Sequence, residues 1–389
     1  MQSKVSNPEF FALTIYLFIN TLFVYKYTSR FTSTPWLWIA CYLICISALV
    51  FLFYKDFDLK IHRKTSNSIF VVSVVFISLT LTLIMLHFDP GHIRVGRFPA
   101  LEDWIARLLN GQYPYISPTR PSGFPFLFLL AMPFYLLGDL GLLQIFAFLI
   151  YVLILRSRYG GEGTNRVRTL ILLTTSPVFL YEIAVRSDLF SNMVLVILYM
   201  MFCENRVRDT KIPALLIMGF VGGLLLATRG IVLLIFLLYF GYLFKNQLKR
   251  GLLFLTGIIT GFIIVILPFA FWNIEYFMRH GPFSIQTSYL PFWLSILLIF
   301  LCIYFAGRAT SPIIVYRYIT SMLFAAVFIA FVISLIGRGW VDTIFGDRFD
   351  ISYFCFTLPF LLLLLDYGRA SANMDGKVFG RFDRLLPLK

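Results

Sequence analysis

The segment FDPGHIRVGRFPALEDWIARLLNGQYPYISPTRPSG, residues 88–123, is the longest polar stretch of a chain that otherwise consists largely of apolar runs. It is followed directly by FPFLFLLAMPFYLLGD, residues 124–139, which is apolar but contains two prolines before its final Gly-Asp. Whether residues 124–137 cross a membrane decides the side on which every later loop lies. The two segments together therefore decide the topology.

The composition outside this region is that of a polytopic membrane protein. Of 389 residues, 59% are hydrophobic and only 13% are charged, and the mean hydropathy is +0.85. Apolar runs of roughly 17 to 25 residues, the length that crosses a bilayer, recur between short polar breaks. We therefore expect an all-α polytopic membrane protein with about twelve transmembrane helices.

The basic residues predict the orientation of the chain. The net charge is +14, and the lysines and arginines gather in breaks at residues 55–64, 156–168, 206–211, 245–250 and 308–317 and in the tail 369–389. Such residues favour the cytoplasmic side of a membrane, so the charge indicates topology and not a nucleic-acid partner. Both termini are then cytoplasmic. The spans that satisfy this rule lie at about residues 10–26, 36–54, 68–87, 139–155, 169–183, 189–204, 213–228, 230–244, 252–272, 290–306, 313–336 and 351–365.

The apolar run at residues 124–137 would break this pattern if it were a thirteenth span, because all later basic breaks would change sides. The run is short and contains Pro125 and Pro133, so we expect an interfacial or re-entrant helix on the outer face. The predicted organisation is one transmembrane domain, residues 1–366, with a large outer loop at residues 88–138. Residues 367–389 form a basic cytoplasmic tail.

The outer loop has a readable helical pattern. Pro99 suits the first turn of a helix, and Gly111 suits its end. The spacing between them predicts an amphipathic helix over residues 99–110 that lies on the membrane surface, with Trp104 as an interface anchor. Its apolar stripe is Leu101, Trp104, Ile105, Leu108 and Leu109, and its polar face carries Glu102, Asp103, Arg107 and Asn110.

Several motifs resemble the GT-C superfamily of integral-membrane glycosyltransferases. They are ARLLNGQYPY (residues 106–115), the prolines at 118 and 121, FYLLGD (134–139), SPVFLYEIAVRSD (176–188) and GDRFDISYFCFTLPF (346–360). The chain departs from the family pattern at one place, because Arg97 stands where such enzymes usually have an acidic residue. The resemblance implies a GT-C-like fold.

The resemblance also implies an activity. Such enzymes transfer a hexosyl or pentosyl group from a polyprenyl-phosphate-linked donor to an acceptor on the extracytoplasmic face. The acceptor here would be a lipid-linked glycan, a polysaccharide or another cell-envelope glycan, and the location the plasma membrane of a bacterium. No cofactor is certain, although a divalent cation is compatible with the chemistry. No metal ligands are assigned.

The chemistry of this reaction selects the candidate residues. A carboxylate is needed to accept the proton of the acceptor hydroxyl, and arginines pair with phosphate oxygens through a planar fork that stays charged. The candidate catalytic carboxylates are Asp89, Glu102 and Asp103, and Asp188 is a further candidate base. The candidate substrate- and phosphate-binding residues are His92, Arg94, Arg97, Tyr115, Arg120, Glu182, Arg186, Asp188, Arg229 and Arg348.

These residues also have structural interpretations. Asp89 precedes a proline and could simply begin a turn, and acids in a first helical turn stabilise the helix dipole. Glu182 and Arg186 have the spacing of an ion pair, and Arg229 could be a snorkelling anchor. A transporter or flippase of a lipid-linked saccharide would share the twelve-span layout. An oligosaccharide polymerase or ligase would share the substrates.

Overall fold

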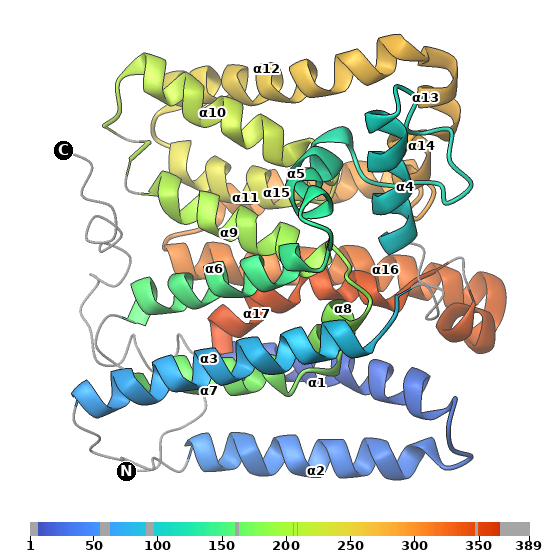
Figure 1. The fold of residues 1–389 in the computed structure, drawn as a ribbon. Helices are drawn as coiled ribbons and strands as arrows, with labels where there is room; N and C mark the ends of the chain where they lie inside the picture. The colour runs from blue at the N-terminus through green and yellow to red at the C-terminus, as the bar shows by residue number, and fades with distance from the viewer. Residues whose placement is uncertain are drawn as a thin grey trace.

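The computed structural model of the chain describes residues 7–54, 63–90, 97–159, 163–204, 206–207, 209–346 and 349–365. Every regular element among these residues is a helix, and most of the helices lie side by side in one bundle (Figure 1). In chain order they are α1 (Asn7–Thr28), α2 (Pro35–Tyr54), α3 (Arg63–His87), α4 (Arg97–Leu109), α5 (Pro125–Leu136), α6 (Leu142–Tyr159), α7 (Gly163–Thr174), α8 (Pro177–Ala184), α9 (Leu189–Glu204), α10 (Ile212–Leu226), α11 (Val232–Phe244), α12 (Leu248–Trp272), α13 (Ile274–His280), α14 (Pro282–Thr287), α15 (Phe292–Arg308), α16 (Pro312–Phe345), the 3-10 helix η1 (Ile351–Phe356) and α17 (Leu358–Leu365).

The helices confirm the predicted class of helical membrane protein. Five are long and apolar enough to cross a bilayer: Phe10–Thr28, Pro35–Phe53, Asn67–His87, Leu248–Trp272 and Pro312–Phe345. Two bent pairs, α7 with α8 and α13–α14 with α15, raise this number to seven if each pair is one span. The predicted number of twelve spans is not confirmed within the described residues.

Part of the difference lies in short helices. The predicted spans at residues 189–204, 213–228 and 230–244 are helices of 16, 15 and 13 residues. The predicted span at 351–365 is η1 followed by α17, which has only eight residues and is buried almost throughout. A helix that is apolar all round can be buried in a protein core as well as in lipid. The number of spans above seven therefore stays a prediction.

The polar breaks between helices gather at two opposite ends of the bundle (Figure 1). The end of α3, the α10–α11 turn, α4, α13 and α14 lie at one end, which we call the site end. The end of α6 and the starts of α10 and α12 lie at the other. The basic breaks at residues 206–211 and 245–250 lead into α10 and α12, and the break at 156–168 begins in α6, so these predicted cytoplasmic breaks share one end. Which end faces the cytoplasm stays a prediction, and the basic tail lies outside the described residues.

The first loop contains the predicted amphipathic helix, but the role expected for Trp104 is wrong. Helix α4 is followed by Gly111, whose φ of 69° is in the left-handed region that glycine tolerates. Trp104 is fully buried and stacks on Phe128 of α5 with ring centroids 4.4 Å apart. It is a core residue between α4 and α5 and does not lie on the surface. Helix α5 has 12 residues, which is too short for a span.

A polar side chain in α1 supports the break between α7 and α8. These two helices bend by 65° around residues 175–176. Asn20, which is fully buried, accepts hydrogen bonds from the Ser176 hydroxyl at 2.7 Å and from the Val178 N–H at 3.3 Å. A broken helix inside an apolar bundle needs such partners for its free backbone groups. Asn20 therefore helps to position α8 and the turn that follows it.

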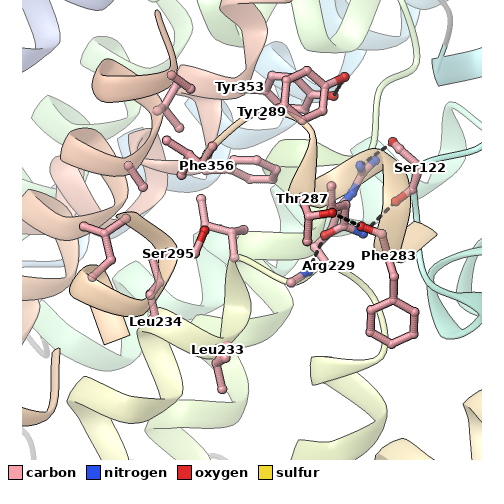
Figure 2. Close-up of a pocket in the computed structure, with 18 of the residues that line it drawn as sticks. Ser122, Arg229, Leu233, Leu234, Phe283, Thr287, Tyr289, Ser295, Tyr353 and Phe356 are labelled. Atoms are coloured by element: carbon pink, nitrogen blue, oxygen red, sulfur yellow. Dashed lines mark hydrogen bonds between the residues drawn. The ribbon is translucent and has the colours of Figure 1, made fainter. Parts of the chain in front are cut away.

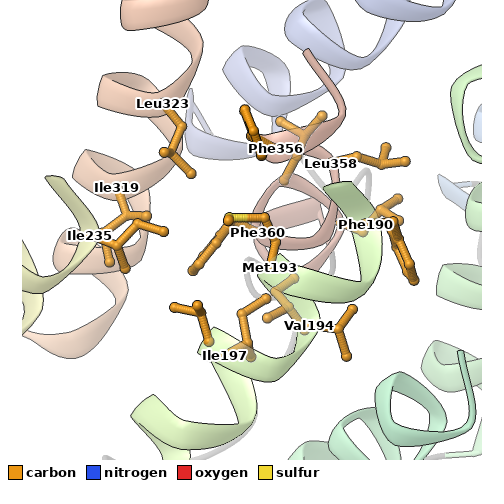
Figure 3. Close-up of a cluster of buried hydrophobic side chains, with 14 of the residues drawn as sticks. Phe190, Met193, Val194, Ile197, Ile235, Ile319, Leu323, Phe356, Leu358 and Phe360 are labelled. Carbon is orange, nitrogen blue, oxygen red and sulfur yellow. The ribbon is translucent and has the colours of Figure 1, made fainter. Parts of the chain in front are cut away.

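The hydrophobic core lies where α9, α11, α16 and α17 converge (Figure 3). Buried apolar side chains from these four helices and from η1 point toward one another here. The labelled members are Phe190, Met193, Val194, Ile197, Ile235, Ile319, Leu323, Phe356, Leu358 and Phe360. Because α9 and η1 begin next to the polar residues described below, this core supports the candidate site.

Candidate functional site

The turn between α8 and α9 brings together three arginines that are far apart in the sequence. The Ser187 hydroxyl accepts a hydrogen bond from Arg97 at 3.2 Å. Asp188 pairs with Arg229 at 2.7 Å, and Arg186 itself pairs with Asp139 at 3.2 Å. Sequence reasoning selected Arg97, Arg186, Asp188 and Arg229, and the structure places all four at this one turn.

The backbone of this turn is unusual. Arg186 has a φ of +51°, a left-handed conformation that is uncommon for a residue with a Cβ. Its guanidinium donates to the Met85 carbonyl at 3.2 Å and lies 5.4 Å from the centre of the Phe98 ring. These contacts hold the turn against α3 and α4. Local strain of this kind is found most often at functional sites.

Arg97 connects the first loop to the C-terminal part of the fold. It is 8% exposed, and its Nη2 donates to Asp350 Oδ2 at 2.6 Å and to the Ser352 hydroxyl at 2.5 Å. Its guanidinium carbon lies 4.9 Å from the centre of the Tyr353 ring. Burial alone raises the pKa of Asp350, but the charges of Arg97 and Lys26 and hydrogen bonds from Ser352 outweigh it and hold that pKa below its ordinary value. Asp350 is therefore ionised at neutral pH.

Glu182 is the fully buried carboxylate next to Arg97. It is fully buried, and its Oε2 accepts the N–H groups of Leu189 at 3.2 Å and Phe190 at 3.4 Å, at the start of α9. Its other oxygen lies 3.7 Å from Arg97. The ion pair with Arg186 that the spacing allowed is not formed, because Arg186 pairs with Asp139 instead. Glu182 thus satisfies free N–H groups of a helix end and faces Arg97.

Arg229 is the arginine of this cluster that lines an apolar cavity. Its Nε and Nη2 bind both carboxylate oxygens of Asp188 at 2.7 to 3.0 Å, and its Nη1 donates to the Ser122 hydroxyl at 3.1 Å. The side chain is 6% exposed, so Arg229 is a buried, paired residue and not a snorkelling anchor. A bidentate pair of this geometry fixes the direction of the guanidinium.

A cavity of about 500 Å³ opens beside Arg229 (Figure 2). Its walls are mainly apolar side chains from α11, α12, α15 and α16. The volume is within the range of roughly 300–1,000 Å³ that is usual for small-molecule sites, which combine apolar walls with a few polar groups. The polar side chains that line it are Ser122, Arg229, Gln286, Thr287, Tyr289, Ser295 and Tyr353.

The three candidate catalytic carboxylates do not line this cavity. Asp89 is exposed at the end of α3, and Glu102 is exposed on α4. Asp103 is half-buried and pairs with Arg107 one helical turn later, at 2.9 Å. Asp89 and Asp103 have interaction partners of their own. The structure therefore leaves the identity of the base as a prediction.

The remaining candidates lie apart from the cavity or outside the described residues. Tyr115 is 1% exposed, and its hydroxyl donates to the Gly123 carbonyl at 3.0 Å, so it holds the loop together. Arg120 is exposed and has a φ of +48°. Three predicted substrate-binding residues lie outside the described residues: His92, Arg94 and Arg348.

Sequence reasoning missed several residues that the fold brings to the site. Asp350 lies in the quoted GDRFD segment and Asp139 closes the quoted FYLLGD segment, but neither was chosen as a site residue. In the sequence, both appear only as acidic residues next to a helix end. Many acidic residues with a purely structural role occupy such positions. Ser122, Ser187 and Gln286 are neutral and had no distinguishing pattern. Only the three-dimensional arrangement identifies them.

The site is rich in matched charges and poor in metal ligands. In the described segments, no group of three or more His, Cys, Asp or Glu side chains is arranged to hold a metal ion. Arg97, Arg186 and Arg229 each face a carboxylate within 3.2 Å.

No family model, no curated protein and no solved structure matches the chain.

Proposed function

We propose that the protein is a membrane glycosyltransferase that moves a sugar from a polyprenyl-phosphate-linked donor to a glycan or lipid-linked acceptor. The observation that carries this proposal is the position of Arg229, which lines an apolar cavity of about 500 Å³. A polyprenyl-phosphate donor has two features that complement this cavity: an apolar chain and an anionic head group. The arginine fork suits phosphate oxygens, and the apolar walls suit the chain.

The proposed topology follows from the charges. We place the site end on the extracytoplasmic face of a bacterial plasma membrane and both termini in the cytoplasm, because the basic breaks gather at the other end. A donor that diffuses in the outer leaflet would then reach the cavity without crossing the bilayer. The product would be a cell-envelope glycan or polysaccharide.

The reaction needs a base and a stabilised leaving group. The acceptor oxygen attacks the anomeric carbon of the sugar, the carbon–oxygen bond to phosphate breaks, and its electron pair leaves with the phosphate beside Arg229. The acceptor proton passes to a carboxylate. Asp89 is the predicted base. Asp350 is a second candidate by its position, because it follows Phe349, which lines the cavity. The charge of Arg97 holds the pKa of Asp350 below its ordinary value and makes it a weak base, so Asp89 is the first choice.

The test is sugar transfer by membranes that contain the protein. A panel of polyprenyl-phosphate-linked sugars is supplied with envelope glycans, and mass spectrometry follows the sugar from donor to acceptor. Replacing the base, as Asp89→Asn or Asp350→Asn, should lower the rate by about 10²- to 10⁴-fold, the usual contribution of general base catalysis. The exposed Glu275, which pairs with Arg279, offers a control outside the candidate site, and Glu275→Gln should leave the rate near that of the wild type.

The outcomes separate the competing functions. Undiminished transfer by Asp89→Asn at normal expression would remove Asp89 as the base, and the same holds for Asp350. If no sugar is transferred but an intact lipid-linked saccharide crosses vesicles that contain the protein, the protein is a flippase and the proposal is wrong. Joining of whole oligosaccharides would identify a polymerase or ligase.

A further inference from the structure

Gln286 of α14 completes a ring of polar groups at the edge of the cavity, whose other members are Arg229, Ser122 and the Gly230 N–H. Its Oε1 accepts the Gly230 N–H at 2.7 Å, and its Nε2 donates to the Ser122 carbonyl at 2.6 Å. These partners fix the orientation of the amide, because one can only donate and the other can only accept. Gln286 thereby joins the first loop, the α10–α11 turn and α14.

At least two N–H hydrogens at this ring are left for a ligand. The Arg229 guanidinium has five N–H donors, and the Asp188 and Ser122 bonds leave at least one hydrogen, on Nη1. The Gln286 amide uses one of its two hydrogens for the Ser122 carbonyl. Within the described part of the chain, neither remaining hydrogen has an acceptor. Both side chains line the cavity.

The charge at this ring is small. Arg229 is the one charged side chain among the described residues that line the cavity, and it also pairs with Asp188. One phosphate group can bind the side of the guanidinium that faces away from Asp188 and share its charge with that carboxylate. A second phosphate group would meet the neutral Gln286 amide and the apolar walls instead of another cation. Burying an uncompensated anionic group in such surroundings is unfavourable. The ring therefore suits an anionic head that carries a single phosphate.

We propose that Arg229 Nη1 and Gln286 Nε2 form a seat for one phosphate group, and that Gln286 makes the site select a lipid monophosphate over a lipid diphosphate. This inference rests on the donor class of the proposed function and narrows it. Gln286 contributes a neutral hydrogen-bond donor where a second cation would be needed for a diphosphate. It is thus a specificity-determining residue that takes no proton in the reaction.

The experiment measures the binding of three short-chain probes to the full-length protein in lipid nanodiscs. Farnesyl monophosphate should bind at least roughly ten-fold more tightly than farnesol, as expected for a hydrogen bond to a charged group. Farnesyl diphosphate should bind no more tightly than the monophosphate. Gln286→Lys should shift the preference toward the diphosphate. Gln286→Glu should weaken both phosphates by about 10- to 100-fold through repulsion and loss of the donor.

A neighbouring residue gives the matched control. Ser288, two residues after Gln286, is not among the residues that line the cavity, and its hydroxyl donates to the Ile285 carbonyl at 2.7 Å. Ser288→Ala should therefore leave the affinity for all three probes unchanged. Melting temperature and elution volume, measured in one detergent for all variants, check that each variant is folded. Gln286→Asn keeps the amide on a shorter side chain and should cause a smaller loss of phosphate affinity than Gln286→Glu.

The possible results distinguish this inference from the proposed function. Tighter binding of the diphosphate by the wild type, or an unchanged preference in a folded Gln286→Lys variant, would overturn the inference. A change of preference caused by Arg348→Gln would also overturn it, because a second cation would then take part. A monophosphate preference that depends on Gln286, in a protein that transfers no sugar, would leave the inference standing and remove the transferase.

Discussion

The acidic residues and arginines of the site form ion pairs in which each partner compensates the charge of the other. Arg97 is almost fully buried between Asp350 and Glu182, and Asp188 is buried against Arg229. Removal of one partner from such a pair leaves an uncompensated charge, which costs more than removal of both. A loss of activity in these variants must therefore be separated from a loss of stability.

Replacement of Asp350 should give a pH-dependent loss of stability. Because Asp350 has a folded-state pKa below its ordinary value of about 3.9, its contribution is present above that pH and is lost as the pH falls further. Asp350→Asn should lower the free energy of unfolding by about 1 to 3 kcal/mol at pH 7. The difference from the wild type should shrink below about pH 4.

Chemical unfolding in detergent, followed by tryptophan fluorescence at several pH values, measures this difference. The exposed pair Glu275–Arg279 provides the control, since surface ion pairs contribute little and Glu275→Gln should have almost no effect at any pH. A difference for Asp350→Asn that stays constant from pH 7 to pH 3 would contradict the role given to the charge of Asp350.

At the scale of elements, α10 and α12 are held together by direct backbone contact. Gly219 and Gly223 of α10 face Gly257 and Gly261 of α12, so that the two backbones touch where a side chain would normally stand. Small residues with this spacing allow the close approach that drives helix association in membranes. Because α10 leads directly to Arg229, this contact also positions the site.

Gly223→Val should force α10 away from α12. A Cβ at this position would collide with the Ile258 carbonyl oxygen, which belongs to the backbone and cannot rotate away. Overpacking of this kind typically costs about 1 to 3 kcal/mol or more, so the melting temperature in detergent should fall clearly. Gly307→Ala, at a helical position with open space around it, is the control and should change it little. Equal melting temperatures for both variants would contradict this packing.

The sequence predicted the local pattern of α4 but not the contacts that this helix makes. The period of Leu101, Trp104 and Ile105 correctly predicted an amphipathic helix, because helical spacing is a local property. It could not tell whether the apolar face meets lipid or protein, so the role of Trp104 was wrong. The segment at residues 176–188 and the arginines at 97, 186 and 229 were singled out separately, and the structure brings them to one turn. The partners of those arginines depend on tertiary contacts, and a neutral residue such as Gln286 has no pattern to find.

At the scale of the whole molecule, the tryptophans mark one end of the bundle. Trp36 and Trp38 begin α2, Trp272 ends α12, Trp293 is in the first turn of α15, and Trp340 lies near the end of α16. All five are exposed, and Figure 1 places these helix ends at the site end. Exposed tryptophans favour the membrane–water interface. We therefore expect the membrane interface to lie level with the site end, the depth at which the proposed lipid-linked donor would carry its head group.

Depth-dependent quenching tests this position. In nanodiscs, the fluorescence of variants that keep one of these five tryptophans, with the others replaced by phenylalanine, should be quenched most by lipids brominated near the head group. Lipids brominated near the chain ends should quench it least. A variant that keeps only Trp104 is the control, because that ring is fully buried between α4 and α5 and should respond weakly to both lipids. Stronger quenching of the five from deep in the bilayer would place the site end inside the membrane, where the head group of a donor does not reside.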